Sequence, residues 1–236
     1  GRTGGFAEGF KIGWICRDGR EMRKIVRQER LKDDKKARLI EAAVEEFSIG
    51  GFAATSLERI AMRAGISKSG IYAHYGSKEE VFEGMLNMLL VPWEGHHCEA
   101  LLEGEEAVSL SDLLDFYLDR IYAQLSDPRA VAAFRLLMTE SGRIPDVVQQ
   151  WARRMLERSL FGDRRFLDLC IERGLIRGDF SNEDYFFGTM PGALWLMQQV
   201  LFGAGDGAPV SQARVRALHK RLLMEVLAPV SPAQAG

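Results

Sequence analysis

The sequence predicts an all-α protein, and three observations lead to this prediction. Apolar residues recur every three or four positions through most of the 236 residues, which is the spacing of one helix face. No stretch of useful length alternates with period two, as a half-buried strand would. Gly, Pro and Asp separate the periodic segments and supply signals for helix ends and turns. We therefore expect a series of helices joined by loops.

The first periodic segment predicts a helix that ends at a pair of glycines. Gly50 and Gly51 follow its apolar stripe, and glycine readily adopts the positive φ with which helices commonly end. We therefore place the end of the helix at this pair. The apolar residues on its buried face are Leu39, Ile40, Ala43, Val44 and Phe47.

The residues before this helix form a basic segment. Between Arg17 and Arg38 the sequence has ten cations and five acids. Such a run can attract an anionic partner such as nucleic acid, although on its own it is more often a solvated helix face or tail. We expect a flexible basic leader over residues 1–32. Residues 1–21 lack a methionine, so Met22 is a plausible natural start.

Residues 55–78 have the spacing of two short helices joined by a tight turn. Such a unit needs a small residue where the helices cross, a residue that tolerates positive φ in the turn, and an apolar anchor on the second helix. Ala61, Gly65 and Ile71 meet these three needs in order. The spacing therefore predicts a helix-turn-helix.

Both short helices have a residue that can cap them. Thr55 or Ser56 can cap the first helix, and Ser67 can cap the second. An isolated helix over residues 68–75 is not stable in water, so neighbouring segments must hold it in place. We infer that this helix serves a purpose other than filling a core.

The outward face of the second helix is short and polar. Ile71 and Tyr75 lie one turn apart and point inward as anchors. Gly70 costs roughly 1 kcal/mol of helix propensity and removes a side chain beside this face. The side chains left outside suit close approach to another surface and are Lys68, Ser69, Tyr72 and Ala73. Those that can donate to a phosphate are Tyr72, His74 and Lys78.

The stretch GGFAATSLERIAMRAGISKSGIYAHYGSKEEVF resembles the DNA-binding region of the TetR family of bacterial transcriptional regulators. The resemblance implies a core position for Tyr75 and DNA-backbone contacts by Thr55, Tyr72, His74 and Lys78. It implies that the residues facing base edges are Lys68, Ser69, Gly70 and Ala73. An ordinary helical hairpin inside a bundle is the alternative, but it does not explain so polar a second helix. The predicted DNA-binding residues are Thr55, Ser56, Ser67, Lys68, Ser69, Gly70, Tyr72, Ala73, His74 and Lys78.

The rest of the chain predicts a larger helical domain. A fourth helix begins behind Ser77, with two acids in its first turn, and Pro92 interrupts it. Residues 185–202 are apolar nearly all round, which predicts burial on several sides. The last helix has one apolar seam that needs a partner. Further helices are expected at about 111–125, 129–141, 145–174, 183–202 and 211–227.

The resemblance implies a helix-turn-helix domain over residues 33–78 and an effector-binding and dimerisation domain over residues 79–236. The segment FRLLMTESGRIPDVVQQW at 134–151 is similar to a Glu-Ser-x-x-x-Pro segment in one branch of the family. The two long helices at the end would form the homodimer. Candidate effector-pocket residues, although residues of these types are more often plain core, are Tyr117, Met138, Trp151, Phe187 and Trp195.

Other functions find little support in the sequence. Neighbouring residues on a helix point about 100° apart, so the run from His96 to Cys98 is a poor metal site, and we expect neither metal nor cofactor. The sequence has no nucleophile motif that would indicate an enzyme. The odd cysteine count, with Cys16, Cys98 and Cys170 far apart, favours a reducing cytosol. No run of 18 apolar residues or signal peptide is present, so we expect a soluble, cytoplasmic protein without membrane partners.

These observations predict a homodimeric transcriptional regulator that binds double-stranded DNA. We expect a repressor whose two recognition helices read a palindromic operator in successive major grooves. A small, largely apolar effector would release it, because the C-terminal helices supply few groups that could pair a buried charge. The alternative is an all-α interaction or scaffold protein that does not use its helical hairpin on DNA.

Overall fold

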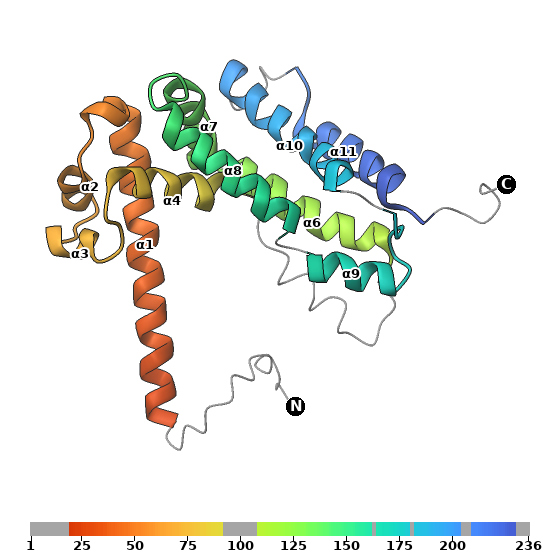
Figure 1. Ribbon diagram of the computed structural model, residues 1–236, viewed down its shortest axis with the longest axis horizontal. Helices are drawn as coiled ribbons and strands as arrows, with labels where there is room; N and C mark the ends of the chain where they lie inside the picture. The colour runs from red at the N-terminus through yellow and green to blue at the C-terminus, as the bar shows by residue number, and fades with distance from the viewer. Residues whose placement is uncertain (1–18, 92–107, 162–163, 180–181, 204–208, 230–236) are drawn as a thin grey trace. The chain divides into compact units, whose positions relative to one another are not determined.

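The protein is described by a computed structural model that covers residues 19–91, 108–161, 164–179, 182–203 and 209–229. In these ranges all regular structure is helical, which confirms the predicted all-α fold (Figure 1). The chain divides into two compact units, Gly1–Arg38 and Leu39–Gly236. The elements described below belong to the second unit unless stated.

Ten helices are labelled in Figure 1. In chain order they are α1 Gly19–Ala54, α2 Leu57–Arg63, α3 Lys68–Tyr72, α4 Lys78–Leu90, α6 Leu110–Leu125, α7 Pro128–Glu140, α8 Pro145–Phe161, α9 Arg164–Glu172, α10 Asn182–Phe202 and α11 Gln212–Leu227. Most of them begin and end within two residues of the predicted positions. Helix α3 ends at Tyr72, three residues before the end predicted for it, and α1, α8 and α9 also differ from the prediction.

Helix α1 is longer than the apolar stripe alone predicts. It begins at Gly19, so residues 19–32, which we expect to belong to a flexible leader, are helical in the structure. Arg, Lys, Glu and Gln dominate this segment, and all four have high intrinsic helix propensity. At the other end Gly51 leaves the helical conformation with φ 70° and ψ 176°. The glycine pair therefore breaks the helix as predicted.

The single helix expected over residues 145–174 is two helices, α8 and α9. Residues 162–163, which lie between them, are outside the described residues. The apolar period continues on both sides of this pair, so periodicity by itself predicts one helix. After α9 the chain turns at Gly174, which has φ 68°.

Aromatic side chains from α1 and α4 form the centre of the N-terminal core. The rings of Phe47 and Phe52 are stacked with centroids 5.7 Å apart. Phe82 of α4 meets both edge-on, at 5.3 and 5.4 Å. Such stacked and edge-on arrangements are the favoured geometries of aromatic pairs. The cluster fixes α4 against α1, and both helices then support the short α2 and α3.

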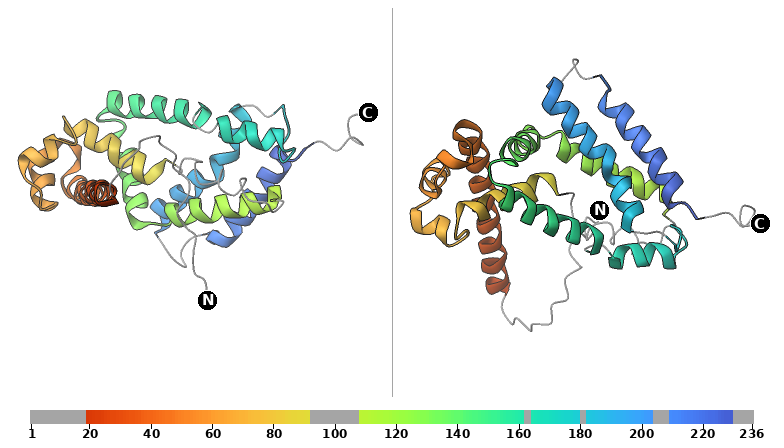
Figure 2. Two further views of the ribbon diagram at one scale, coloured as in Figure 1. Left: turned by 90° about the horizontal axis from the view of Figure 1, so that it is seen from below. Right: turned by 45° about the horizontal axis from the view of Figure 1, so that its top comes forward.

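The larger bundle is built around α10. This helix packs against α11, α6, α7 and α8, as the right-hand view of Figure 2 shows for its neighbour α11. Helix α4 packs against α6, α7 and α8, so it belongs to both the N-terminal helices and the bundle. Trp151 of α8 strengthens this junction, because its indole N–H donates to Asn87 Oδ1 of α4 at 3.0 Å.

A buried histidine links three helices inside the bundle. His219 of α11 lies 2.6 Å from the Gly188 carbonyl of α10 and 3.1 Å from the Tyr122 hydroxyl of α6. A carbonyl only accepts, so Nε2 carries the proton and Nδ1 accepts from Tyr122. Burial lowers the pKa of His219, which favours this neutral form. Burial also raises the pKa of Tyr122 to about 12.

The end of α7 meets the end of α1. Glu140 is buried, and its Oε1 would lie 3.1 Å from a Cβ built on Gly51. Arg143 approaches the same carboxylate oxygen at 3.3 Å. The Glu-Ser-x-x-x-Pro segment therefore lies at the junction of the bundle with the N-terminal helices. None of the helices within the described ranges is long and apolar enough to cross a bilayer.

Candidate nucleic-acid interface

A buried carboxylate attaches α2 to α1. Glu46 accepts from Nε of Arg59 at 2.9 Å and from Nε of Arg63 at 2.6 Å. The hydrogen bond from Arg63 is the main cause that lowers the pKa of this carboxyl. Ser56 caps α2, and its side chain accepts from the Arg59 backbone N–H at 3.3 Å. Of the two candidate caps, Ser56 is therefore the one used.

The turn between α2 and α3 has the predicted geometry. Gly65 has φ 65°, the left-handed conformation that glycine adopts without strain. The Ile66 N–H donates to the Ala61 carbonyl at 2.9 Å, which closes the turn. Ile71 is fully buried and anchors α3. The helix-turn-helix spacing predicted from Ala61, Gly65 and Ile71 is thus confirmed.

Gly70 has a structural reason that the sequence did not indicate. Ser67 caps α3 by accepting from the Gly70 N–H at 3.1 Å. A Cβ at Gly70 would lie 2.5 Å from Ile66 Cγ2 and 3.1 Å from the Ser67 hydroxyl oxygen. Carbon atoms in contact are normally about 3.5–4.0 Å apart. The glycine is therefore required by the packing of the turn, in addition to any open space that it leaves beside the outer face.

The predicted outer face of α3 is exposed. The exposed residues of this face and of the segment directly after it are Lys68, Ser69, Tyr72, Ala73 and His74. The Tyr75 side chain is instead buried, as predicted. Its ring fits over Gly84 of α4, where a Cβ would come within 2.9 Å of Tyr75 Cε1. The structure thus separates an anchoring side of α3 from a free side.

The structure adds an acid to this face that sequence reasoning missed. Lys68 Nζ lies 2.8 Å from Oε1 of Glu58, and the Tyr72 hydroxyl donates to the same oxygen at 3.4 Å. The hydrogen bond from Lys68 is the main cause that lowers the pKa of Glu58 to about 2. A possible signal was its position in the first turn of α2, two residues after the cap, on the side facing α3.

Two residues predicted to contact the DNA backbone form hydrogen bonds within the protein instead. Thr55 is only 3% exposed, and its hydroxyl lies 2.8 Å from the Gly51 carbonyl and 3.1 Å from that of Glu46. A DNA contact by the Thr55 side chain does not fit this placement. It instead helps to fasten the segment that joins α1 and α2.

Lys78 has a similar internal role. Its ammonium donates to the carbonyls of Phe52 at 3.0 Å, Ala53 at 3.3 Å and Thr55 at 3.4 Å. The same group lies 4.5 Å from the centroid of the Phe52 ring. An ammonium has three N–H donors, and these carbonyls occupy all of them. In this arrangement Lys78 caps the end of α1.

A cavity of about 80 Å³ lies in the larger bundle, between α6, α9, α10 and α11. Its wall is almost entirely apolar. The residues that line it are Leu110, Leu113, Leu114, Tyr117, Phe166, Leu167, Cys170, Ile176, Thr189, Leu223 and Leu227.

Of the five predicted pocket residues, only Tyr117 lines this cavity. Trp151 and Trp195 are buried core residues, and Trp195 meets the Tyr122 ring edge-on at 6.4 Å. Met138 and Phe187 are 54% and 66% exposed. Aromatic and Met residues are frequent in helix cores and at protein surfaces that bind partners, so residue type alone does not select pocket walls.

The metal-binding question falls partly outside the described residues. The run from His96 to Cys98 lies there, as does Cys16. In the ranges that the structure covers, no group of three His, Cys, Asp or Glu residues could hold a metal ion. The one cysteine described, Cys170, is buried.

A capped α2–α3 hairpin on α1 and α4, followed by a larger helical bundle, defines a helix-turn-helix protein of two domains. The sequence profile of the family described as bacterial regulatory proteins, tetR family, matches residues 39–85. The chain is similar to this family over these residues. The match covers α2 and α3 completely, together with the parts of α1 and α4 that pack on them.

Similar proteins are helix-turn-helix regulators. An HTH-type transcriptional repressor of Streptomyces coelicolor is 49% identical over 51 residues, which are 22% of this chain and 27% of the repressor. The uncharacterized regulator YerO of Bacillus subtilis is 29% identical over 114 residues, 48% of this chain and 38% of YerO. The chain thus spans less than two fifths of the length of either relative.

Solved structures extend the likeness to the bundle. A TetR-family regulator from Mesorhizobium loti has a TM-score of 0.58 and 22% identity, over 82% of this chain and 96% of that one. At this identity the match shows the fold. It supports an N-terminal helix-turn-helix followed by a larger helical domain.

Proposed function

We propose that the protein is a transcriptional regulator that binds double-stranded DNA through α3, and that it acts as a repressor in the cytoplasm. The observation that carries this proposal is the exposed polar face of a helix that is anchored on its other side. Ile71 and Tyr75 are buried, whereas Lys68, Ser69 and Tyr72 are exposed one residue or one turn away. A helix built in this way can enter a major groove and present side chains to base edges.

The residues proposed to contact DNA are a revised form of the predicted set. Thr55 and Lys78 are left out because their polar groups are used internally. The proposed contacts are Ser56, Ser67, Lys68, Ser69, Gly70, Tyr72, Ala73 and His74. We also propose residues 33–78 as the DNA-binding domain and residues 79–236 as the effector-binding and dimerisation domain.

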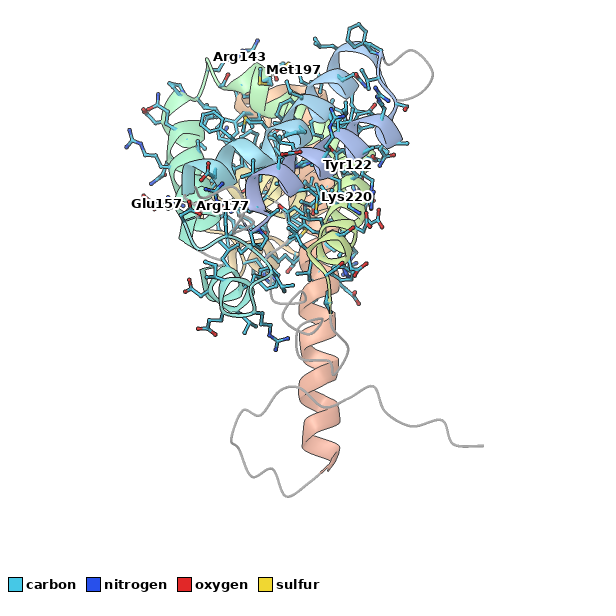
Figure 3. The ribbon with its side chains drawn as sticks, turned by 90° about the vertical axis from the view of Figure 1, so that its right-hand side faces the viewer. Tyr122, Arg143, Glu157, Arg177, Met197 and Lys220 are labelled. Atoms are coloured by element: carbon cyan, nitrogen blue, oxygen red, sulfur yellow. The ribbon has the colours of Figure 1, made fainter. Side chains whose placement is uncertain are left out.

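An exposed apolar stripe on α10 supports a homodimer. Phe187, Leu194, Met197 and Leu201 are exposed and recur at spacings of seven, three and four, which places them along one side of the helix. Leu218 and Leu222 extend the apolar surface on α11. Figure 3 faces these two helices and labels Met197 on α10. Exposed apolar patches of this kind commonly mark protein interfaces, and two copies would bury the stripe in a four-helix interface.

The cavity between α6, α9, α10 and α11 is the proposed effector site. Its apolar wall fits a small, largely apolar molecule, since a buried charge would find little compensation there. At about 80 Å³ it is well below the roughly 300–1,000 Å³ of most ligand pockets. An effector larger than a few atoms would therefore favour a state in which the surrounding helices have moved apart.

Helix α4 is the proposed link between the effector site and DNA. It packs on α6, which lines the cavity, and it begins at Lys78, six residues after α3 ends. A shift of α6 would move α4 and, through it, the spacing of the two recognition helices in the dimer. An effector that binds only the shifted state would release DNA by differential affinity for the two states.

The test begins with selection of bound duplexes from a random library, because the operator sequence is not needed for it. The full-length protein is expected to enrich a palindrome with half-sites about 34 Å apart. Affinity for that duplex should fall steeply as salt rises, since phosphate contacts release counterions. If no sequence were enriched and salt had little effect, the protein would instead be an interaction or scaffold protein.

A further inference from the structure

An acidic side chain lies in the middle of the proposed DNA-binding surface. The Glu58 carboxylate is 47% exposed, and Lys68, its partner across the α2–α3 turn, is 67% exposed. Their charged atoms are 2.8 Å apart. Tyr72 donates to the same carboxylate oxygen at 3.4 Å. The pair therefore presents a donor and an acceptor side by side to whatever approaches α3.

The fold gives this acid only a modest role: it lies in the first turn of α2, where a negative charge suits the helix N-terminus. Ser56 already caps α2, and the buried Glu46 attaches α2 to α1 through Arg59 and Arg63. An exposed ion pair contributes little to stability. On a surface that meets phosphates, a negative charge lowers affinity for every DNA sequence. Selectivity for one base pair would offset this general loss of affinity.

The geometry of the pair matches the edge of a base pair. In the major groove guanine offers the acceptors O6 and N7, and cytosine offers the N4 donor beside them. O6 and N4 are hydrogen-bonded to each other, so they lie about 2.9 Å apart. Lys68 and Glu58 present the complementary donor and acceptor 2.8 Å apart. Both groups could therefore bind one base pair at once.

A thymine–adenine pair offers an acceptor and a donor in the same order but fits less well. Thymine has one acceptor, O4, where guanine has two, and its methyl group occupies the adjoining space. The Lys68 ammonium would thus lose one hydrogen bond and meet an apolar group. In the reversed pairs, the carboxylate of Glu58 would face an acceptor and be repelled.

We propose that Glu58 and Lys68 act as one unit that reads a single G·C base pair in each half-site, with Lys68 donating to guanine and Glu58 accepting from cytosine N4. This inference rests on the proposed DNA-binding function and adds a specificity-determining residue to it. Glu58 lowers general affinity and rejects other base pairs at one position, so that the discrimination of the pair exceeds that of Lys68 alone.

The test compares duplex selection by the wild type with that by Glu58→Gln, Lys68→Ala and the control Glu45→Gln. Glu45 is also exposed and paired with a cation, Arg63, at 2.6 Å, but it belongs to α1. Both glutamine variants remove one negative charge per subunit and keep the side-chain shape. They should therefore raise affinity for random DNA by similar factors, and melting temperatures will show that each variant is folded.

The wild type is expected to prefer G·C at a symmetric pair of positions. Glu58→Gln and Lys68→Ala should both lose this preference at the same pair, by about tenfold on duplexes that differ there. Glu45→Gln should keep it. Unchanged preference in Glu58→Gln, or a change at positions other than those of Lys68→Ala, would overturn the inference while leaving DNA binding intact. A wild type that enriched no sequence would overturn the proposed function and the inference together.

Discussion

Replacing Tyr75 by Phe should stabilise the protein. The ring is 8% exposed and lies between α3 and α4, and its hydroxyl has no hydrogen-bond partner among the residues that the structure describes. A buried hydroxyl without a partner costs about 1–3 kcal/mol. Removing one oxygen atom leaves a void smaller than a water molecule, which at about 24 cal/mol per Å³ costs only a few tenths of a kcal/mol. The net gain should be about 1 kcal/mol.

Thermal and urea unfolding, followed by circular dichroism, will measure this gain. For a chain of this size 1 kcal/mol corresponds to roughly 2–4 °C in the melting temperature. Tyr72→Phe is the matched control, because it removes the same atom from an exposed ring. It should leave the melting temperature unchanged and weaken binding to all DNA by a similar factor, since a phosphate contact positions the protein without reading sequence.

The advantage of Tyr75→Phe should grow at alkaline pH. Burial raises the pKa of Tyr75 above its ordinary value of 10, so the folded state holds this proton more tightly than the unfolded state. The corresponding stability is present below pH 10 and is lost as the pH rises through the folded pKa. Tyr122 is present in both proteins, so its titration contributes equally to both and does not affect the difference in stability between them. A variant less stable than the wild type, or a difference that did not widen above pH 10, would mean that the hydroxyl has a partner.

Three further outcomes are expected. Gly70→Ala should melt several degrees lower than the wild type because its Cβ meets Ile66, whereas Ser69→Ala should not; equal melting temperatures would show that the turn can adjust. The free energy of unfolding should decrease as the pH falls below about 6.5 toward the lowered pKa of His219. His219→Ala leaves the Tyr122 hydroxyl and the Gly188 carbonyl without this partner, so it should lose about 2–4 kcal/mol in urea unfolding and much of this pH dependence. If the variant kept the same loss of stability in acid, another group would be its cause. Leu201→Glu should convert the proposed dimer to monomer in sedimentation, and an unchanged mass would move the interface away from α10.

The sequence by itself determined the helices, their caps and the turn of the helix-turn-helix. Ser67 caps α3, Gly65 has positive φ, and Ile71 is the buried anchor, as their spacing predicts. Each of these features is settled by residues three or four positions away, because caps, tight turns and helix faces are formed by near neighbours in the chain.

The tertiary structure alone decided what each polar side chain does. Lys78 donates to carbonyls 23 to 26 residues earlier in the chain. The Thr55 hydroxyl donates to the Gly51 carbonyl inside the protein. Glu58 meets Lys68 only because the turn folds α3 back along α2. A long polar side chain has many chemically suitable hydrogen-bond partners in the sequence. Which of them lies within reach depends on which helices pack together. A motif therefore predicts where a recognition helix lies, whereas the surrounding packing decides which of its residues remain free to bind.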